Sequence, residues 1–137
     1  MQYWLFKSEP NTWSWDDQLA KGSLGEEWDG VRNYQARNFM RQMQVGDQGF
    51  FYHSLKEKSV VGIVEVIALA HPDSTTDDPR WECVDIKAVK SVLKPVSLAQ
   101  IKLRSDLADM VLIKNSRLSV QPVTHQQWTV ICEMAGL

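Results

Sequence analysis

Residues 28–38 of the chain read WDGVRNYQARN and lead from a loop into a helix. Asn33 is a typical helix N-cap, and the i, i+3, i+4, i+7 stripe of one buried helical face follows it as Ala36, Phe39, Met40 and Met43. An aromatic ring, a glycine and two arginines therefore gather at the start of that helix. Glycine permits close backbone approach, and the free N–H groups of a helix N-terminus favour anions. The stretch predicts a pocket for a flat, polar ligand, with the Trp28 ring as a stacking face.

Two other segments carry polar groups at the predicted ends of strands. They are residues 4–10, WLFKSEP, and residues 50–54, FFYHS. In each, an aromatic run passes directly into hydrogen-bonding or charged side chains. We expect the three segments to form the walls of one pocket.

The remaining pattern predicts a single α+β domain over residues 1–137, with about five strands and short peripheral helices. A curved or barrel-like sheet fits the length of the middle strands. The last strand is expected at an edge because Pro122 cannot donate to a ladder. Strands are predicted near 3–6, 48–54, 59–70, 82–93 and 118–123, and helices are predicted to begin at Ser14, Asn33, Ser97 and Thr124.

Composition limits the function. The 137 residues suit one core, and a formal net charge of −2 argues against a protein that grips long duplexes by bulk electrostatics. Any nucleic-acid contact must come from a local basic patch. Cys83 and Cys132 lie far apart, as expected of free thiols in a reducing compartment, and the start lacks a secretory pattern, so we expect a cytoplasmic protein.

Catalysis and metal binding are not expected. His53 and Ser54 are adjacent on a predicted strand, so their side chains point to opposite faces. The chain has no nucleophile elbow, no glycine-rich phosphate or dinucleotide loop and no zinc-deaminase cysteine pair. His53, His71 and His125 are scattered along the sequence, which predicts no metal and no cofactor site.

Four blocks resemble the EVE domain family: residues 3–10, 28–38, 46–54 and 117–123, the last followed by Trp128. The resemblance spans essentially the whole chain, although Phe6 stands where a methionine is common. It implies a PUA-like fold, similar to PUA, ASCH and YTH domains. It also implies recognition of nucleic acid that carries a modified base, with 5-methylcytosine and its oxidised forms as the usual targets in DNA.

A reader of one base in a duplex must extrude it, which costs a few kcal/mol. Stacking on aromatic rings returns roughly 1–3 kcal/mol per base, whereas a methyl group adds only about 0.8 kcal/mol. Trp28 is the predicted stacking ring, with Tyr52 or Trp4 as a second face, although Trp4 lies within a strand and favours the core. Trp128 belongs to a helical core stripe, and Trp13, Trp15 and Trp81 cannot be interpreted alone.

The predicted site has two parts, a base pocket and a set of phosphate contacts. In the base pocket, Glu9 is the proposed acceptor for an exocyclic amine such as that of cytosine. The base pocket comprises Ser8, Glu9, Trp28, Gly30, Val31, Asn33, Tyr52, His53 and Ser54, and the phosphate contacts are Lys7, Arg32, Arg37 and Arg117.

The partner is therefore expected to be DNA or RNA with a modified base, and no membrane. A free nucleoside would fill the same pocket, and a general PUA-like RNA-binding module or a small nucleic-acid-modifying enzyme are further alternatives. The acidic loop at residues 73–78 would suit a protein partner, but most such loops are merely solvated.

Overall fold

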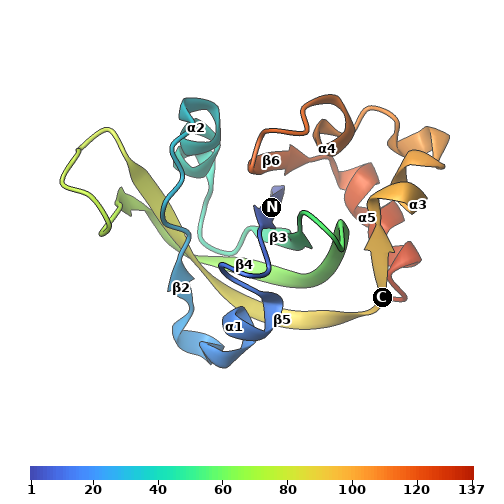
Figure 1. Ribbon diagram of the computed structural model, residues 1–137, viewed down its shortest axis with the longest axis horizontal. Helices are drawn as coiled ribbons and strands as arrows, with labels where there is room; N and C mark the ends of the chain where they lie inside the picture. Colours follow the sequence, from blue (N-terminus) through green and yellow to red (C-terminus); the bar gives the residue numbers. More distant parts are fainter.

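A six-stranded mixed sheet with short helices on both faces forms the domain (Figure 1). The computed structural model describes all residues, Met1–Leu137. The strands are β1 (Tyr3–Ser8), β2 (Glu26–Glu27), β3 (Gln48–His53), β4 (Ser59–Pro72), β5 (Glu82–Ser97) and β6 (Val120–Val123). The helices are α1 (Trp15–Ala20), α2 (Tyr34–Gln42), α3 (Leu98–Lys102), α4 (Val111–Lys114) and α5 (His125–Met134), with 3-10 turns η1 (Gly22–Leu24) and η2 (Ser105–Leu107). None of the helices is long and apolar enough to cross a membrane.

The strand order is β2-β5-β4-β3-β1-β6, in which β1 and β3 are parallel and the other neighbours are antiparallel. Long β4 and β5 bend together beneath the rest of the molecule (Figure 1), and their pairing shifts register several times, as β-bulges do. The sheet is therefore curved but open, with β2 and β6 at its edges. The α+β class and the edge position of the Pro122 strand are confirmed, whereas β2 was missed because two residues give no periodic signal.

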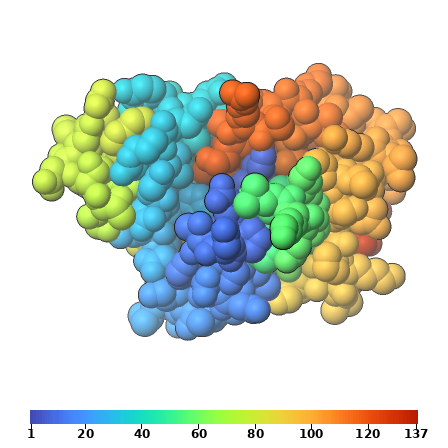
Figure 2. Space-filling model, viewed as in Figure 1, coloured from blue at the N-terminus to red at the C-terminus, as the bar shows by residue number.

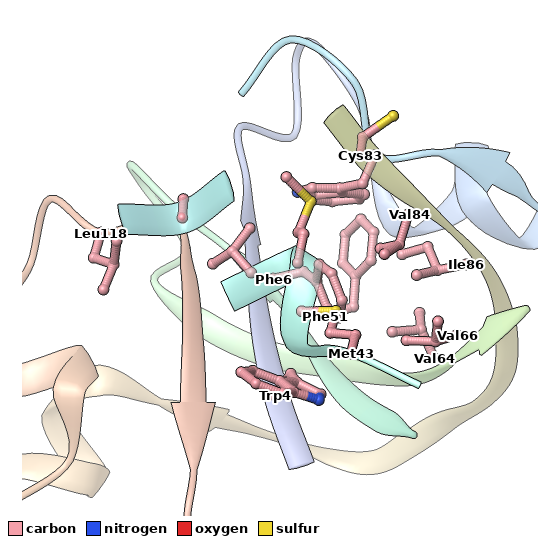
Figure 3. Packing of buried hydrophobic residues seen from close by; sticks show 14 of the residues in the cluster. Trp4, Phe6, Met43, Phe51, Val64, Val66, Cys83, Val84, Ile86 and Leu118 are labelled. Atoms are coloured by element: carbon pink, nitrogen blue, oxygen red, sulfur yellow. The ribbon is translucent and has the colours of Figure 1, made fainter. Parts of the chain in front are cut away.

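The two faces of the sheet carry separate cores. Along β1, Trp4 and Phe6 point into one core and Leu5 into the other, as alternation on a strand requires. Figure 3 shows Trp4, Phe6 and Phe51 gathered inside the curve of the sheet. Trp28 packs in this first core, and the opposite face is closed by α5.

The predicted helix starts are confirmed. The side chains of Ser14, Asn33, Ser97 and Thr124 each accept a hydrogen bond from the backbone N–H three residues later. Each cap satisfies one of the orphan donors of its helix N-terminus. These local signals position α2 beside the loop at residues 28–33.

One glycine is required by close packing. Gly62 on β4 lies under the Trp15 indole, and a Cβ added there would stand 2.3 Å from the ring. The indole is also held in place, because Trp15 Nε1 donates to Ser91 Oγ at 2.8 Å and the ring packs against Phe51 at a centroid distance of 5.2 Å. A methyl group at position 62 would therefore have to displace a buried ring with two fixed partners.

We expect Gly62→Ala to lower the free energy of unfolding by about 1–3 kcal/mol because it overpacks this contact. Urea unfolding measures the change. Glu65→Ala on the same strand is the control, since it removes only a solvent-accessible 3.6 Å ion pair with Lys87 and should stay within about 0.5 kcal/mol of wild type. Equal stability of Gly62→Ala and wild type would contradict the packing argument.

Candidate functional site

A cavity of about 390 Å³ opens where the end of β1 meets the loop at residues 28–32. This volume lies within the range of about 300–1,000 Å³ typical of ligand pockets. The blue, cyan and orange segments that line it come together on the face in Figure 2. The lining residues are Lys7, Ser8, Glu9, Thr12, Trp13, Glu26, Glu27, Trp28, Asp29, Gly30, Val31, Arg32 and Ser119.

Trp28 is shared between the cavity and the core. Only 8% of the residue is exposed, and its ring meets Phe6 at 5.3 Å and Phe51 at 5.6 Å in edge-to-face geometry. Its backbone N–H donates to the Val84 carbonyl oxygen at 2.9 Å. Trp28 therefore forms a rigid wall of the cavity, but most of its surface is already used by core neighbours.

Trp13 supplies the more open aromatic surface. A turn in which the Glu9 carbonyl oxygen accepts hydrogen bonds from the Thr12 and Trp13 N–H groups returns the chain to the cavity. The Ser8 hydroxyl donates to the Trp13 carbonyl oxygen, and the Trp13 indole N–H donates to Gln18 Oε1 at 3.0 Å. The sequence missed this residue, because a lone tryptophan in a loop has no periodic pattern that assigns it to a site.

The cavity is acidic inside. Glu9, Glu26, Glu27 and Asp29 line it, against the cations Lys7 and Arg32. Burial and the neighbouring charges of Asp73, Glu27 and Glu26 raise the pKa of Asp29, and Arg32 only partly offsets them. Glu26 pairs with Lys21 and Glu27 accepts hydrogen bonds from Ser74, so Glu9 and Asp29 are the carboxylates left to accept from an N–H donor in the cavity.

Both the side chain and the backbone N–H of Lys7 already make hydrogen bonds within the protein. Burial lowers the pKa of its ammonium, which donates to the Ser116 carbonyl oxygen. The Lys7 backbone N–H also donates to the Ser119 carbonyl oxygen at 2.8 Å, so this residue ties β1 to the chain before β6. A ligand phosphate would have to compete with these bonds.

A buried carboxylate holds the cavity loop in place. Asp73 has a side chain that is 1% exposed, and it accepts hydrogen bonds from Gly30 N at 2.9 Å, Arg32 Nη1 at 3.1 Å and Thr75 N at 2.8 Å. Burial alone would raise its pKa, but these bonds outweigh burial and lower the pKa of Asp73 to about 2. Gly30 adopts a φ of 76°, a left-handed conformation that suits glycine, and so points its N–H at this carboxylate.

The structure brings together about half of the predicted site. Ser8, Glu9, Trp28, Gly30 and Val31 line the cavity, as do the predicted phosphate contacts Lys7 and Arg32. The sequence did not identify the other lining residues, which are Thr12, Trp13, Glu26, Glu27, Asp29 and Ser119.

Three predicted pocket residues at the end of β3 lie elsewhere. Tyr52 points into the second core, on the face of the sheet opposite Trp28, and burial raises its pKa to about 12. His53 is buried, where its Nε2 accepts from Trp15 N at 2.9 Å and its Nδ1 contacts Glu57. Ser54 donates to the carbonyl oxygen of Ser8, a cavity-lining residue at the end of β1, and so contacts the cavity wall without lining it.

Three further predicted residues are also outside the cavity. Asn33 uses its side-chain oxygen to cap α2, accepting from Ala36 N at 2.9 Å. Arg37 lies on the outer face of α2 beside Tyr34. Arg117 is exposed and makes no ion pair.

One cluster behind the cavity has metal-ligand chemistry that the sequence did not suggest. Ligand atoms of Glu27, His71 and Cys83 lie within 4.8 Å of one another. However, His71 Nδ1 lies 3.0 Å from the Pro72 carbonyl oxygen and Nε2 lies 2.7 Å from Asp85 Oδ1, so both nitrogens act as donors. Burial and the surrounding carboxylates raise the pKa of the Cys83 thiol, so a metal would have to displace protons from both residues.

A curved open sheet with a cavity at the strand ends is characteristic of PUA-like folds. At 9% identity, an ASCH protein from Zymomonas mobilis shares this fold with a TM-score of 0.63, over 98% of this chain and 99% of that one. The chain belongs to the EVE domain family, whose model matches residues 2–134.

Two solved structures are similar along the whole chain. A protein from Agrobacterium tumefaciens is 58% identical, with a TM-score of 0.99 over 100% of this chain and 94% of that chain. The human THYN1 protein is 32% identical, with a TM-score of 0.92 over 100% of this chain and 99% of that chain. The latter structure is a complex of that human protein with DNA containing 5-methylcytosine.

Asp73→Asn should destabilise the protein by about 2 kcal/mol near pH 7, the free energy equivalent of the lowered pKa. A depressed carboxylate pKa stabilises the fold above the unfolded value and loses that stabilisation as the pH falls toward the folded value. The wild-type advantage should therefore shrink between pH 4 and pH 2. Urea unfolding across this range measures it, and a pH-independent difference would contradict the assignment.

His71→Gln should destabilise the protein more at pH 5.5 than at pH 9. Burial opposes the charge of His71, but the hydrogen bonds to Asp85 and the Pro72 carbonyl oxygen, with the charges of Asp85 and Glu27, raise its pKa. A raised histidine pKa stabilises the fold fully below the unfolded value, and this contribution disappears as the pH rises through the folded value. His125→Gln in the exposed first turn of α5 is the control, and an identical pH profile for both variants would contradict the charge assignment.

Proposed function

We propose that this protein binds DNA containing 5-methylcytosine or a related modified cytosine, and that the extruded base enters the cavity beside Trp28. The proposal rests on the combination of aromatic walls and acidic lining residues in one cavity of suitable size. The similar human protein, with its 5-methylcytosine DNA complex, supports the same class of ligand.

The polarity of the cavity favours a base over a phosphate. Cytosine presents an exocyclic amine that donates hydrogen bonds, and Glu9 or Asp29 is a suitable acceptor. A phosphate inside would be repelled by the acidic lining, above all by the unpaired carboxylates of Glu9 and Asp29, whereas at the rim it would meet Arg32. The base is therefore expected inside and its phosphate outside.

The apolar wall favours a methylated pyrimidine. Trp13 and Trp28 offer ring surface, and Val31, next to Gly30, adds an aliphatic side chain to the lining. A methyl group adds about 0.8 kcal/mol through burial, which is roughly a fourfold preference. Stronger discrimination would require a polar group of the pocket to lose its partner when the modification is absent.

The site supports binding rather than catalysis. Its lining contains no histidine and no cysteine, and the Ser8 hydroxyl donates to a backbone carbonyl oxygen instead of to a base. His53, which the sequence places beside Ser54, is buried away from the cavity and holds the start of α1. We therefore propose a non-catalytic reader.

The test is fluorescence anisotropy with labelled 12-mers that differ in one cytosine: plain, 5-methyl or 5-hydroxymethyl. Duplex and single-stranded DNA and the matching RNA are measured at two salt concentrations. Tighter binding of a modified DNA supports the proposal. Binding of RNA alone, or equal affinity for all three bases, contradicts it.

Trp13→Leu should weaken binding of the modified 12-mer by about 5- to 100-fold, the loss expected for one stacking ring. Trp28→Ala is unsuitable, because the Trp28 ring packs in the core and its removal should cost about 3–5 kcal/mol of stability. Exposed Leu103→Ala is the control and should bind as wild type does. Unchanged binding by Trp13→Leu would remove Trp13 from the site.

A further inference from the structure

An exposed pair of aromatic rings lies next to the cavity and has no role in it. Tyr34, the first residue of α2, stacks with Trp81, which precedes β5, at a centroid distance of 4.9 Å and an interplanar angle of 26°. Tyr34 is 49% exposed and Trp81 is half-buried. We refer to these two rings as the Tyr34–Trp81 platform.

Three arginines surround the platform. The guanidinium carbon of Arg37 lies 4.8 Å from the Tyr34 centroid, and that of Arg32 lies 5.4 Å from the Trp81 centroid. Arg80 donates to the Tyr34 hydroxyl at 3.1 Å. Aromatic rings interleaved with arginines are the typical composition of a surface that holds a nucleic-acid strand.

Arg37 carries the uncompensated charge of this group. Arg32 pairs with Asp73 and Arg80 with Asp78, but Arg37 makes no ion pair. Its guanidinium donates instead to neutral oxygens, the Arg80 carbonyl and Asn38 Oδ1. These bonds use three of the five N–H donors of an arginine, so two remain for a phosphate.

Arg32 joins the platform to the cavity. It lines the cavity and at the same time lies against the Trp81 ring. The loop that carries Trp81 packs beside the segment at residues 28–42 on the face in Figure 2, where the yellow-green and cyan atoms touch. If a base is held in the cavity, the nucleotide next to it in the strand would therefore lie close to the platform.

We propose that the Tyr34–Trp81 platform binds the DNA strand next to the extruded base, stacking one neighbouring base on the rings while Arg37 contacts its phosphate. This inference rests on the proposed function of the cavity. The platform gives affinity without reading the modification, because every base has a stacking face and every nucleotide has a phosphate.

The occupant is a nucleic-acid strand rather than a peptide because of the way the arginines are arranged. The guanidinium groups of Arg32 and Arg37 lie over the rings and keep N–H donors available, which suits alternating bases and phosphates. Since only Arg37 lacks a carboxylate partner, we expect a shallow salt dependence with about one phosphate neutralised at the platform.

The experiment measures two quantities for each variant: affinity for a 12-mer duplex with one 5-methylcytosine, and the ratio of that affinity to the affinity for plain cytosine. Trp81→Leu should weaken both duplexes about tenfold and leave the ratio unchanged. Trp81→Phe should restore binding, since it keeps a ring. Arg37→Gln should lower the slope of log K against log salt by about one.

The control is Arg104→Gln, which removes an exposed arginine that pairs with Asp106 just after α3 and should change nothing; Figure 1 shows α3 at the opposite end of the molecule from α2. Wild-type binding by both Trp81→Leu and Arg37→Gln would overturn the platform and leave the cavity proposal standing. If Trp81→Leu bound the methylated and plain duplexes equally, the platform would also be overturned, because Trp81 would then act on base selection in the cavity. Absence of wild-type selectivity would refute the cavity function and this inference with it.

Discussion

The parallel pairing of β1 with β3 fixes which aromatic side chains face each of the two cores. Because side chains alternate along a strand, Trp4, Phe6 and Phe51 face one core, and Leu5 and Tyr52 face the other. A slip of one residue in β1 would move Trp4 and Phe6 out of the first core and put Leu5 in their place. The aromatic residues on the first face give Trp28 its packing site, and that site fixes one wall of the cavity.

The cavity is therefore an extension of the core. Trp28 contacts Phe6 and Phe51 on one side and the cavity on the other. The loop that follows it has no secondary structure of its own, and it is held by the buried Asp73 carboxylate through Gly30 and Arg32. A site built in this way is preorganised, so little conformational entropy is lost when a ligand binds.

Local chemistry made much of the fold predictable. The helix caps, including Asn33, and the edge strand with Pro122 follow from neighbouring residues alone. Tyr52 was expected in the pocket, but its side chain lies in the second core. The run at residues 50–53 is buried on both sides of the sheet, so no alternation in the sequence shows which face each residue takes. Asp73 and Trp81 were missed for a different reason: their partners lie more than 40 residues away, and no sequence pattern reveals that pairing.

In the proposed function, the acidic cavity selects the base and the arginines outside it attract the polymer. Acidic residues line the cavity, whereas the arginines lie at its rim and on the outer face of α2. With most of those arginines paired and a net charge of −2, affinity for plain polymer should be weak. Weak background binding is an advantage for a reader of a rare base, because the many unmodified sites then compete poorly. The same protein with a strongly basic surface would bind DNA more tightly and yet select the modified base less well.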